Sequence, residues 1–118
     1  MYEIIKKQKK DVRLVGNIGN PILLEKNITD KTIFVIEASS YQIDYSQYFK
    51  TDYAFILNIS PDHLDRHKSI QQYAHAKFKL ILNQNKNFCA FVENNKYLNR
   101  EFKKYKIISK IIKIKKNN

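Results

Sequence analysis

Three predicted strands of this 118-residue chain are followed directly by polar side chains whose types could do chemistry. After Val15 comes a turn with glycine and asparagine, after Ile36 an acid with two serines, and after Leu57 a segment with acids, histidines and an arginine. Ligands of a parallel α/β sheet bind beyond the carboxyl ends of its strands, so we expect these segments to meet at one edge with the composition of an active site. The segments are Gly16-Asn-Ile-Gly19, Glu37-Ala-Ser-Ser40 and Asn58-Ile-Ser-Pro-Asp-His-Leu-Asp-Arg66.

The first two segments each allow a structural and a functional interpretation. The two glycines fit a tight turn and nothing more, or they let a polar ligand approach the backbone while Asn17 offers its amide. Glu37 ends an apolar strand, so it is either a carboxylate facing water or a hard oxygen ligand for Mg²⁺. Ser39 and Ser40 can cap a following turn or donate hydrogen bonds to a substrate.

The third segment, together with His67 directly after it, places two acids, two imidazoles and one guanidinium between Asp62 and His67. It is either an exposed polar loop or a phosphate and metal site, in which an imidazole binds metal and an acid orients Arg66. A zinc site of two histidines and one glutamate is conceivable, but the chain has no H-E-x-x-H helix to support it.

A helix predicted over 69–83 carries a lysine where its pattern calls for an apolar residue. Ser69 and Gln72 fit a capping box, which sets the start of the helix. Apolar residues then recur at helical spacing, and Lys77 takes the i+7 position of their stripe. Its ammonium either extends to the edge of the apolar stripe, where it meets water, or is held inward. Held inward, it needs carboxylate partners or a chemical modification of the amine. The stripe consists of Ile70, Tyr73, Ala74, Phe78 and Ile81.

The elements that must position these residues alternate between strand and helix, which predicts an open, mostly parallel α/β sheet flanked by helices. Three apolar runs are continuous rather than alternating, as in central strands covered on both faces. No repeat, linker or domain boundary is evident, so we expect one small domain at most. Strands are expected at 32–36, 53–57 and 88–92, with weaker candidates at 11–15 and 109–114, and helices at 2–9, 21–26, 69–83 and 96–105.

The composition narrows the classes of function. The formal net charge is +11, but residues 16–85 carry seven basic and seven acidic side chains, so the excess lies in the flanks. Lysines scattered among isoleucines favour a solvated basic surface over nucleic-acid binding. One cysteine excludes a disulfide framework and suits a reducing compartment. Without a signal peptide or an apolar run of the roughly 20 residues that a membrane span needs, a cytoplasmic location and no membrane partner are expected.

Glycine usage gives a separate exclusion. The chain has two glycines, and neither begins a G-x-x-x-x-G-K-[ST] pattern. These residues therefore cannot build a Walker-type phosphate loop of their own.

Taken together, the motifs resemble the central domain of the Mur ligase family over roughly residues 10–95, in both order and spacing. Each motif is weak alone, and their combination is specific. The glycine turn and the glutamate-serine segment favour the branch that adds D-glutamate over the other Mur ligases and the folylpolyglutamate synthetases. The matching pieces are Gly16-Asn-Ile-Gly-Asn-Pro21, Phe34-Val-Ile-Glu-Ala-Ser-Ser-Tyr-Gln-Ile43, Ile56-Leu-Asn-Ile-Ser-Pro-Asp-His-Leu-Asp-Arg-His67 and Gln72-Tyr-Ala-His-Ala-Lys77.

The resemblance implies an ATP-dependent amide-bond ligase of peptidoglycan synthesis, which joins D-glutamate to UDP-N-acetylmuramoyl-L-alanine through an acyl phosphate, with two Mg²⁺ ions offsetting the phosphate charge. It implies that Lys77 is a carbamylated lysine, a modification that needs the neutral amine and turns an awkward cation into a carboxylate-like ligand. His63 and Lys77 are the expected catalytic residues. The further contacts implied are Glu37, His63 and Lys77 with the metals, Asn17 and Ser39 with the UDP-muramoyl substrate, and Asp62 with the site beside His63.

Several parts of the family's pattern are missing from these residues: the amino-terminal UDP-binding domain, the phosphate loop and the carboxy-terminal domain. We therefore expect residues 1–118 to be a partial central domain that does not catalyse ligation alone, with 96–118 adding one helix and one strand. The alternatives are a fragment of another Mur or folylpolyglutamate-type ligase, an inactive remnant, and a small basic nucleic-acid-binding domain.

Overall fold

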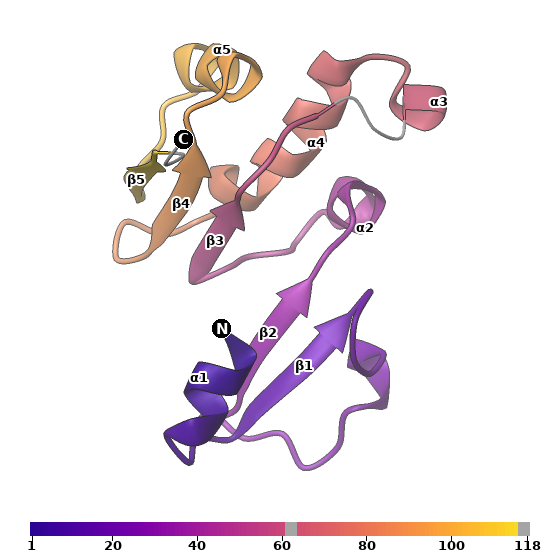
Figure 1. Cartoon of the computed structure of the whole chain (residues 1–118), viewed down its shortest axis with the longest axis vertical. Coiled ribbons are helices and arrows are strands. Elements are labelled where there is room, and N and C mark those ends of the chain that lie inside the picture. Colours follow the sequence, from indigo (N-terminus) through magenta and orange to yellow (C-terminus); the bar gives the residue numbers. More distant parts are fainter. Residues whose placement is uncertain (61–63, 116–118) are drawn as a thin grey trace. The chain divides into compact units, whose positions relative to one another are not determined.

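The computed structural model describes residues 1–60 and 64–115, and it divides the chain into two compact units, each with its own parallel sheet (Figure 1). Unit 1 is Met1–Ser39 and unit 2 is Ser40–Asn118. Helices accompany both sheets, so the predicted α/β class with parallel strands is confirmed. No change in composition marks the division at Ser39, which is why the sequence does not reveal it.

Unit 1 is built on two parallel strands, β1 (Val12–Gly16) and β2 (Ile33–Glu37), whose pairing runs from Val12 with Ile33 to Gly16 with Glu37. Val12 and Val15 are the buried hydrophobic residues of its described core. The helix expected at 2–9 is present as α1 (Tyr2–Lys7), and the one expected at 21–26 is a single 3₁₀ turn, η1 (Ile22–Leu24). Unit 1 therefore buries little apolar surface.

Unit 2 contains a three-stranded sheet in the order β3-β4-β5, in which both pairings are parallel. All five predicted strands are present with bounds close to those expected, whereas α2 and α3 were not predicted. No helix in the described part of the chain has both the length and the apolar character that crossing a bilayer requires. The elements are α2 (Ser40–Tyr45), β3 (Tyr53–Ile56), α3 (Leu64–His67), α4 (Ile70–Leu82), β4 (Cys89–Glu93), α5 (Lys96–Lys104) and β5 (Lys110–Ile114).

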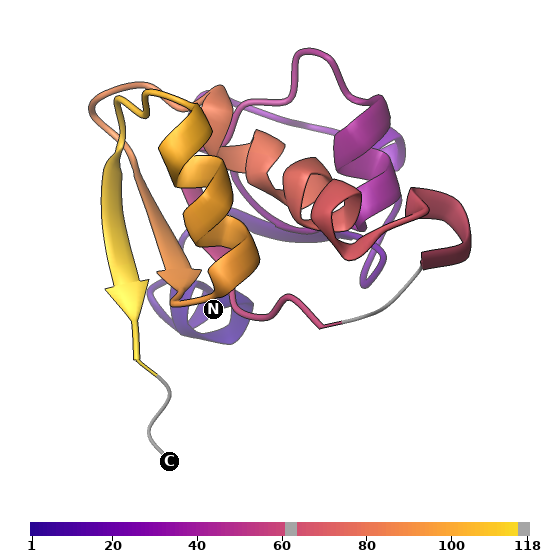
Figure 2. The same ribbon diagram turned by 90° about the horizontal axis from the view of Figure 1, so that it is seen from above.

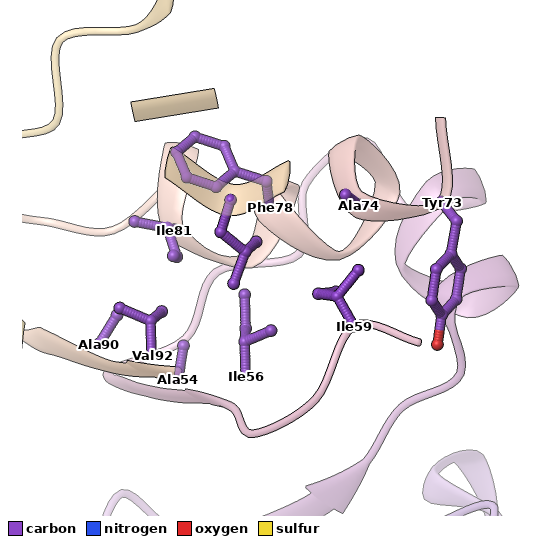
Figure 3. Close-up of a cluster of buried hydrophobic side chains, with 10 residues drawn as sticks. Ala54, Ile56, Ile59, Tyr73, Ala74, Phe78, Ile81, Ala90 and Val92 are labelled. Carbon is purple, nitrogen blue, oxygen red and sulfur yellow. The ribbon is translucent and has the colours of Figure 1, made fainter. Parts of the chain in front are cut away.

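The core of unit 2 lies between one face of its sheet and helices α4 and α5 (Figures 2 and 3). Phe78 of α4 and Leu98 of α5 are completely buried in it. The Phe78 ring meets Phe102 of α5 edge to face, with 4.9 Å between ring centroids. The predicted stripe of α4 is confirmed as the core-facing side, since Tyr73, Ala74, Phe78 and Ile81 are buried and Ile70 packs at the margin.

Side-chain caps fix the starts of α4 and α5. The Ser69 Oγ accepts a hydrogen bond from the Gln72 N–H at 3.2 Å, which confirms the predicted start of α4. The Asn95 side chain caps α5 by accepting from the Tyr97 N–H at 2.9 Å. Its amide also donates to the Ile59 carbonyl at 3.2 Å, which ties α5 to the segment after β3.

The continuous apolar run of β3 does not have both faces covered, so that expectation is wrong for this strand. Burial alternates along it: Ala54 and Ile56 are buried, whereas Tyr53 is 63% and Phe55 39% exposed. Phe55 stacks on Phe91 of β4, with 4.7 Å between the ring centroids. The strand thus has a core face of small and branched residues and an opposite face of aromatic residues.

Glu101 of α5 is a buried carboxylate held by two basic side chains. It accepts hydrogen bonds from the His75 Nδ1 of α4 and from the Lys104 Nζ, each at 2.7 Å. Burial raises the pKa of Glu101, but the hydrogen bonds from Lys104 and His75 outweigh burial and hold this pKa below its usual 4.5. A charged carboxylate therefore joins α4 to α5.

Unit 2 is expected to lose stability in acid through Glu101. A carboxyl whose pKa is lowered by folding stabilises above its unfolded pKa, and this contribution disappears as the pH falls below about 4.5 and through the lower folded value. Urea midpoints should therefore fall with pH in the parent chain and fall less in Glu101→Gln. Asp44→Asn is the control, because the hydrogen bond from Lys79 also lowers the pKa of Asp44, but this carboxyl is exposed. Identical acid dependence of Glu101→Gln and the parent would contradict the prediction.

Candidate functional site

The turn after β1 folds back onto β1 and against the end of β2. The Gly16 N–H donates to the Asn20 carbonyl at 3.2 Å, and the Asn20 N–H donates to the Leu14 carbonyl at 3.1 Å. The Asn17 N–H donates to the Glu37 carbonyl at 2.9 Å. Backbone hydrogen bonds therefore connect the first predicted segment to the start of the second.

Both glycines of this turn are required by the backbone geometry. Gly16 has φ +104° and Gly19 has φ +87°, in the region that side chains disfavour. A Cβ at Gly16 would lie 2.3 Å from the Glu37 carbonyl oxygen, and one at Gly19 would lie 2.1 Å from that of Leu14. The close approach at each glycine is thus made by this chain's own backbone, which supports the tight-turn interpretation of the glycines.

Replacing Gly16 with alanine is expected to lower the free energy of unfolding of unit 1 by at least about 2 kcal/mol, because a strained φ and a backbone clash act together. Asn17→Ala is the matched control, since it removes an exposed side chain and keeps the backbone hydrogen bond to Glu37. Amide exchange across the β1–β2 pairing measures the difference. Equal exchange rates in the two variants would overturn the argument.

Asn17 and Glu37 lie at one edge of unit 1. The parallel register pairs Gly16 with Glu37, so both segments begin at the carboxyl ends of their strands. The side chains of Asn17 and Glu37 are exposed, and Ser39 is half-buried two residues further on. The common edge expected for the first two segments is therefore present, and the binding roles of Asn17, Glu37 and Ser39 stay predictions.

Lys77 reaches the carboxyl end of β3. Its Nζ donates to the Asn58 carbonyl at 3.4 Å and lies 4.7 Å from the centroid of the Tyr73 ring. The side chain is half-buried on the core-facing side of α4. The ammonium is thus directed to the strand end at which a parallel sheet binds ligands.

Asp62 and His63 lie outside the described residues, so their predicted roles stay predictions. The chain leading to them is held in place, because Ile59 is buried and its carbonyl accepts the Asn95 amide. Asn58 donates from its side chain to the Ser60 Oγ at 3.3 Å. The polar residues at the end of β3 are therefore anchored up to Ser60.

Arg66 is held by two tyrosines of α2. Its guanidinium carbon lies 4.7 Å from the ring centroid of Tyr41 and 5.0 Å from that of Tyr45, and its Nη2 donates to the Tyr45 hydroxyl. Cation–π contacts of this kind orient a guanidinium. The predicted polar segment thus contributes to the packing of α3 on α2.

A buried hydroxyl–imidazole pair joins the second and third segments. Ser40 Oγ and His67 Nε2 lie 2.8 Å apart, and the His67 ring stacks on Tyr41 with 5.1 Å between centroids. A serine beside a histidine could form a nucleophile and its base, but Ser40 and His67 are 2% and 5% exposed. This pair is therefore structural. The two residues lie 27 positions apart, so no local feature of the sequence predicts their contact.

A shallow pocket of about 460 Å³ lies on the helical side of unit 2. Its carboxylates are already bound, Asp44 by Lys79 at 2.5 Å and Glu101 by its two basic partners. Arg66 and His67 of the third predicted segment line this pocket, whereas Asn17, Glu37, Ser39 and Lys77 are not among its described lining residues. The described lining residues are Asp44, Arg66, His67, Gln71, Gln72, His75, Glu101, Lys104 and Tyr105.

The described residues hold no group of three or more histidine, cysteine, aspartate or glutamate side chains placed to bind a metal ion. Among the predicted metal ligands, Glu37 offers an exposed carboxylate in unit 1. Oxygen donors of this kind suit Mg²⁺ better than zinc, which prefers nitrogen and sulfur. A carboxylate therefore suits magnesium, and the metal-binding roles of Glu37, His63 and Lys77 stay predictions.

Comparison with known proteins finds similarity that extends over both units. A family model described as the Mur ligase middle domain matches residues 1–118. A protein of Caldicellulosiruptor bescii named UDP-N-acetylmuramoylalanine–D-glutamate ligase is 47% identical over 83 residues, which are 69% of this chain and 18% of that protein. A protein of the same name from Phenylobacterium zucineum is 42% identical over 83 residues, which are 70% of this chain and 18% of that protein. Another from Clostridioides difficile is 37% identical over 89 residues, which are 74% of this chain and 20% of that protein. The chain therefore spans about a fifth of the length of these relatives.

Proposed function

The chain belongs to the Mur ligase family, as a part of its middle domain, and from this membership we propose that it supplies a substrate- and metal-binding edge of a D-glutamate-adding ligase. The observation that carries the proposal is the position of Lys77, half-buried on α4 with its ammonium at the carboxyl end of β3. A carboxylate-like group there would lie where parallel sheets bind their ligands. The names and identities of the relatives support the choice of D-glutamate.

The proposed reaction forms one amide bond at the expense of ATP. The γ-phosphoryl group passes to the carboxylate of UDP-N-acetylmuramoyl-L-alanine, releasing ADP and leaving an acyl phosphate. The D-glutamate amine then attacks the acyl carbon, the new C–N bond forms, and phosphate leaves with the electrons of the broken C–O bond. These substrates are cytoplasmic metabolites, so the proposed place of action is the cytoplasm.

In this proposal Asn17 and Ser39 bind the UDP-muramoyl substrate, and Asp62 supports the site beside His63. Glu37, His63 and carbamylated Lys77 would hold Mg²⁺, which when bound offsets the negative charge of the phosphates. The chain's own contribution is to present an amide, a hydroxyl and a carboxylate in fixed positions, since binding in the correct orientation supplies much of the rate of a two-substrate reaction. The tight turn at Gly16 and the hydrogen bond from the Asn17 N–H to the Glu37 carbonyl support this proposal, since they fix the backbone at Asn17.

These 118 residues alone are expected not to bind magnesium ATP with micromolar affinity, because they contain no phosphate-loop pattern. Isothermal titration of the folded chain should give no saturable heat, with a phosphate-loop ATPase as the positive control. Saturable binding in the micromolar range would refute this expectation.

A hybrid enzyme tests the proposed function. In it, the matched segment of this chain replaces its counterpart in the C. bescii ligase, and the product is measured with D-glutamate and UDP-N-acetylmuramoyl-L-alanine. A second hybrid, with the counterpart from the P. zucineum ligase, controls for the exchange itself. We expect both hybrids to ligate D-glutamate. A folded but inert hybrid of this chain beside an active control hybrid would refute the proposal.

A further inference from the structure

We infer that Glu25 and Arg13 are positioning residues, which hold the Gly16–Asn20 turn in the shape that presents Asn17. The inference rests on the proposed function, in which Asn17 binds the UDP-muramoyl substrate. Neither Glu25 nor Arg13 belongs to the motifs that carry the family resemblance. Their role follows from the contacts of unit 1.

The Glu25 carboxylate joins strand β1 to the end of the turn. Its Oε2 accepts a hydrogen bond from the Arg13 Nη1 at 3.0 Å, and its Oε1 accepts one from the Asn20 Nδ2 at 3.0 Å. Only 6% of the Glu25 side chain is exposed, and its bond with Arg13 is partly buried, whereas its bond with Asn20 lies at the surface. One carboxylate thus connects Arg13, near the start of β1, to Asn20, whose backbone closes the turn on Gly16 and Leu14.

Apolar packing does not hold this part of the chain. The three residues of η1 follow the turn, and Ile22, Leu23 and Leu24 are 42%, 94% and 69% exposed. Ile18, inside the turn, is 56% exposed. With little apolar burial between Gly16 and Glu25, the order of this loop depends on its polar contacts.

Arg13 is itself fixed from its other side. Its Nε donates to Asp11 Oδ1 at 2.8 Å, and Asp11 Oδ2 accepts from the Thr32 hydroxyl at 2.7 Å. The hydrogen bonds from Arg13 and Thr32 lower the pKa of Asp11, which keeps this carboxylate charged in the physiological range. A continuous polar chain therefore runs from the start of β2 through β1 to the turn.

Amide exchange and substrate titration of the full chain, both followed by NMR, test the inference. In Glu25→Ala, the N–H groups of Asn17 and Asn20 should exchange about tenfold faster or more, since two charge-assisted hydrogen bonds are lost. The Ile33 N–H, which bonds to the Asp11 carbonyl, should keep its protection and serves as the internal control. Glu25→Gln should fall between the parent and Glu25→Ala, because its single amide oxygen can accept from one partner. Asp30→Asn is the matched control for loss of an exposed acid.

UDP-N-acetylmuramoyl-L-alanine is then titrated into the parent and the variants. If Glu25→Ala lowers the affinity for this nucleotide sugar about tenfold while the Ile33 N–H keeps its protection, the result supports a positioning role. Loss of a purely structural residue would not give this combination. Equal Asn17 exchange in Glu25→Ala and Asp30→Asn overturns the inference. If Glu25→Ala unfolds unit 1, Asn20→Ala decides, since it removes one hydrogen bond and leaves the Arg13–Glu25 pair: faster Asn17 exchange supports the inference, and parental exchange overturns it. If the parent chain does not bind the nucleotide sugar, this result counts against the proposed function. The exchange data still decide the positioning inference.

Discussion

In the hybrid ligase, Lys77→Ala is expected to reduce the rate of ligation roughly 10²–10³-fold, the usual cost of removing a charge-stabilising group from an active site. The Lys77 side chain is half-buried, and its Nζ lies 3.4 Å from the Asn58 carbonyl at the end of β3. Under the proposed function its carbamate serves the metal site, and alanine leaves that position without a ligand. Initial rates of phosphate release dependent on D-glutamate measure the loss.

Lys79→Ala is the matched control for Lys77→Ala. Lys79 lies two residues further along α4, and its ammonium pairs with Asp44 at 2.5 Å, away from the strand end. Its loss should leave the rate within a few-fold of the parent hybrid. Acetate or another short carboxylate should restore part of the activity of Lys77→Ala and none in Lys79→Ala. Full turnover of Lys77→Ala without added carboxylate would contradict the carbamate role.

The second large effect is expected in the core of unit 2, where Phe78→Ala should lower the free energy of unfolding by about 3–5 kcal/mol. Phe78 is fully buried in the cluster that Figure 3 shows, and its ring packs edge to face against Phe102. Removing the ring leaves a cavity between α4 and α5, and a loss of this size is a large part of the stability of a small domain. Urea unfolding followed by far-UV circular dichroism measures it.

Phe55→Ala is the matched control for Phe78→Ala, because it removes the same ring from the opposite, partly exposed face of the sheet. It should cost clearly less, since the lost contact is mainly the stacking on Phe91. Equal losses in the two variants would show that the helices do not define the core. Because Phe78 follows Lys77 on α4, its loss should also reduce ligation by the hybrid.

The strands and the longest helix could be predicted because their signals are local. Apolar runs bounded by polar residues mark β2, β3 and β4, and a cap followed by an apolar stripe marks α4. Parallel pairing then follows from the alternation of strand and helix, and with it the common edge of Asn17 and Glu37. Recognition of the family required the combination of four motifs, since each motif alone also fits an ordinary turn or loop.

The remaining features depend on contacts between distant residues. Helices α2 and α3 have six and four residues, too few to show a helical period. The contacts of Ser40 with His67 and of Glu101 with His75 span 27 and 26 positions, and the residue types alone do not pair them. Gln84 is a further case: buried in a loop, its amide donates to the carbonyls of Asp52 and Cys89 at 3.3 and 3.0 Å. Polar residues of this kind look like surface residues in a sequence.

The parallel pairing of the strands also limits the rate of folding. Val12 pairs with Ile33, Tyr53 with Cys89 and Cys89 with Lys110, so each of these pairings closes a loop that contains a whole crossover. Closing such loops lowers the entropy of the chain before the strand contacts that offset this loss have formed. Folding is therefore slower than for a helical bundle of equal length. Capped α4 can form within microseconds, whereas β3 must wait for β4 and its neighbours. During that delay the aromatic side chains of β3 are open to other chains, so the refolding yield should fall as the protein concentration rises.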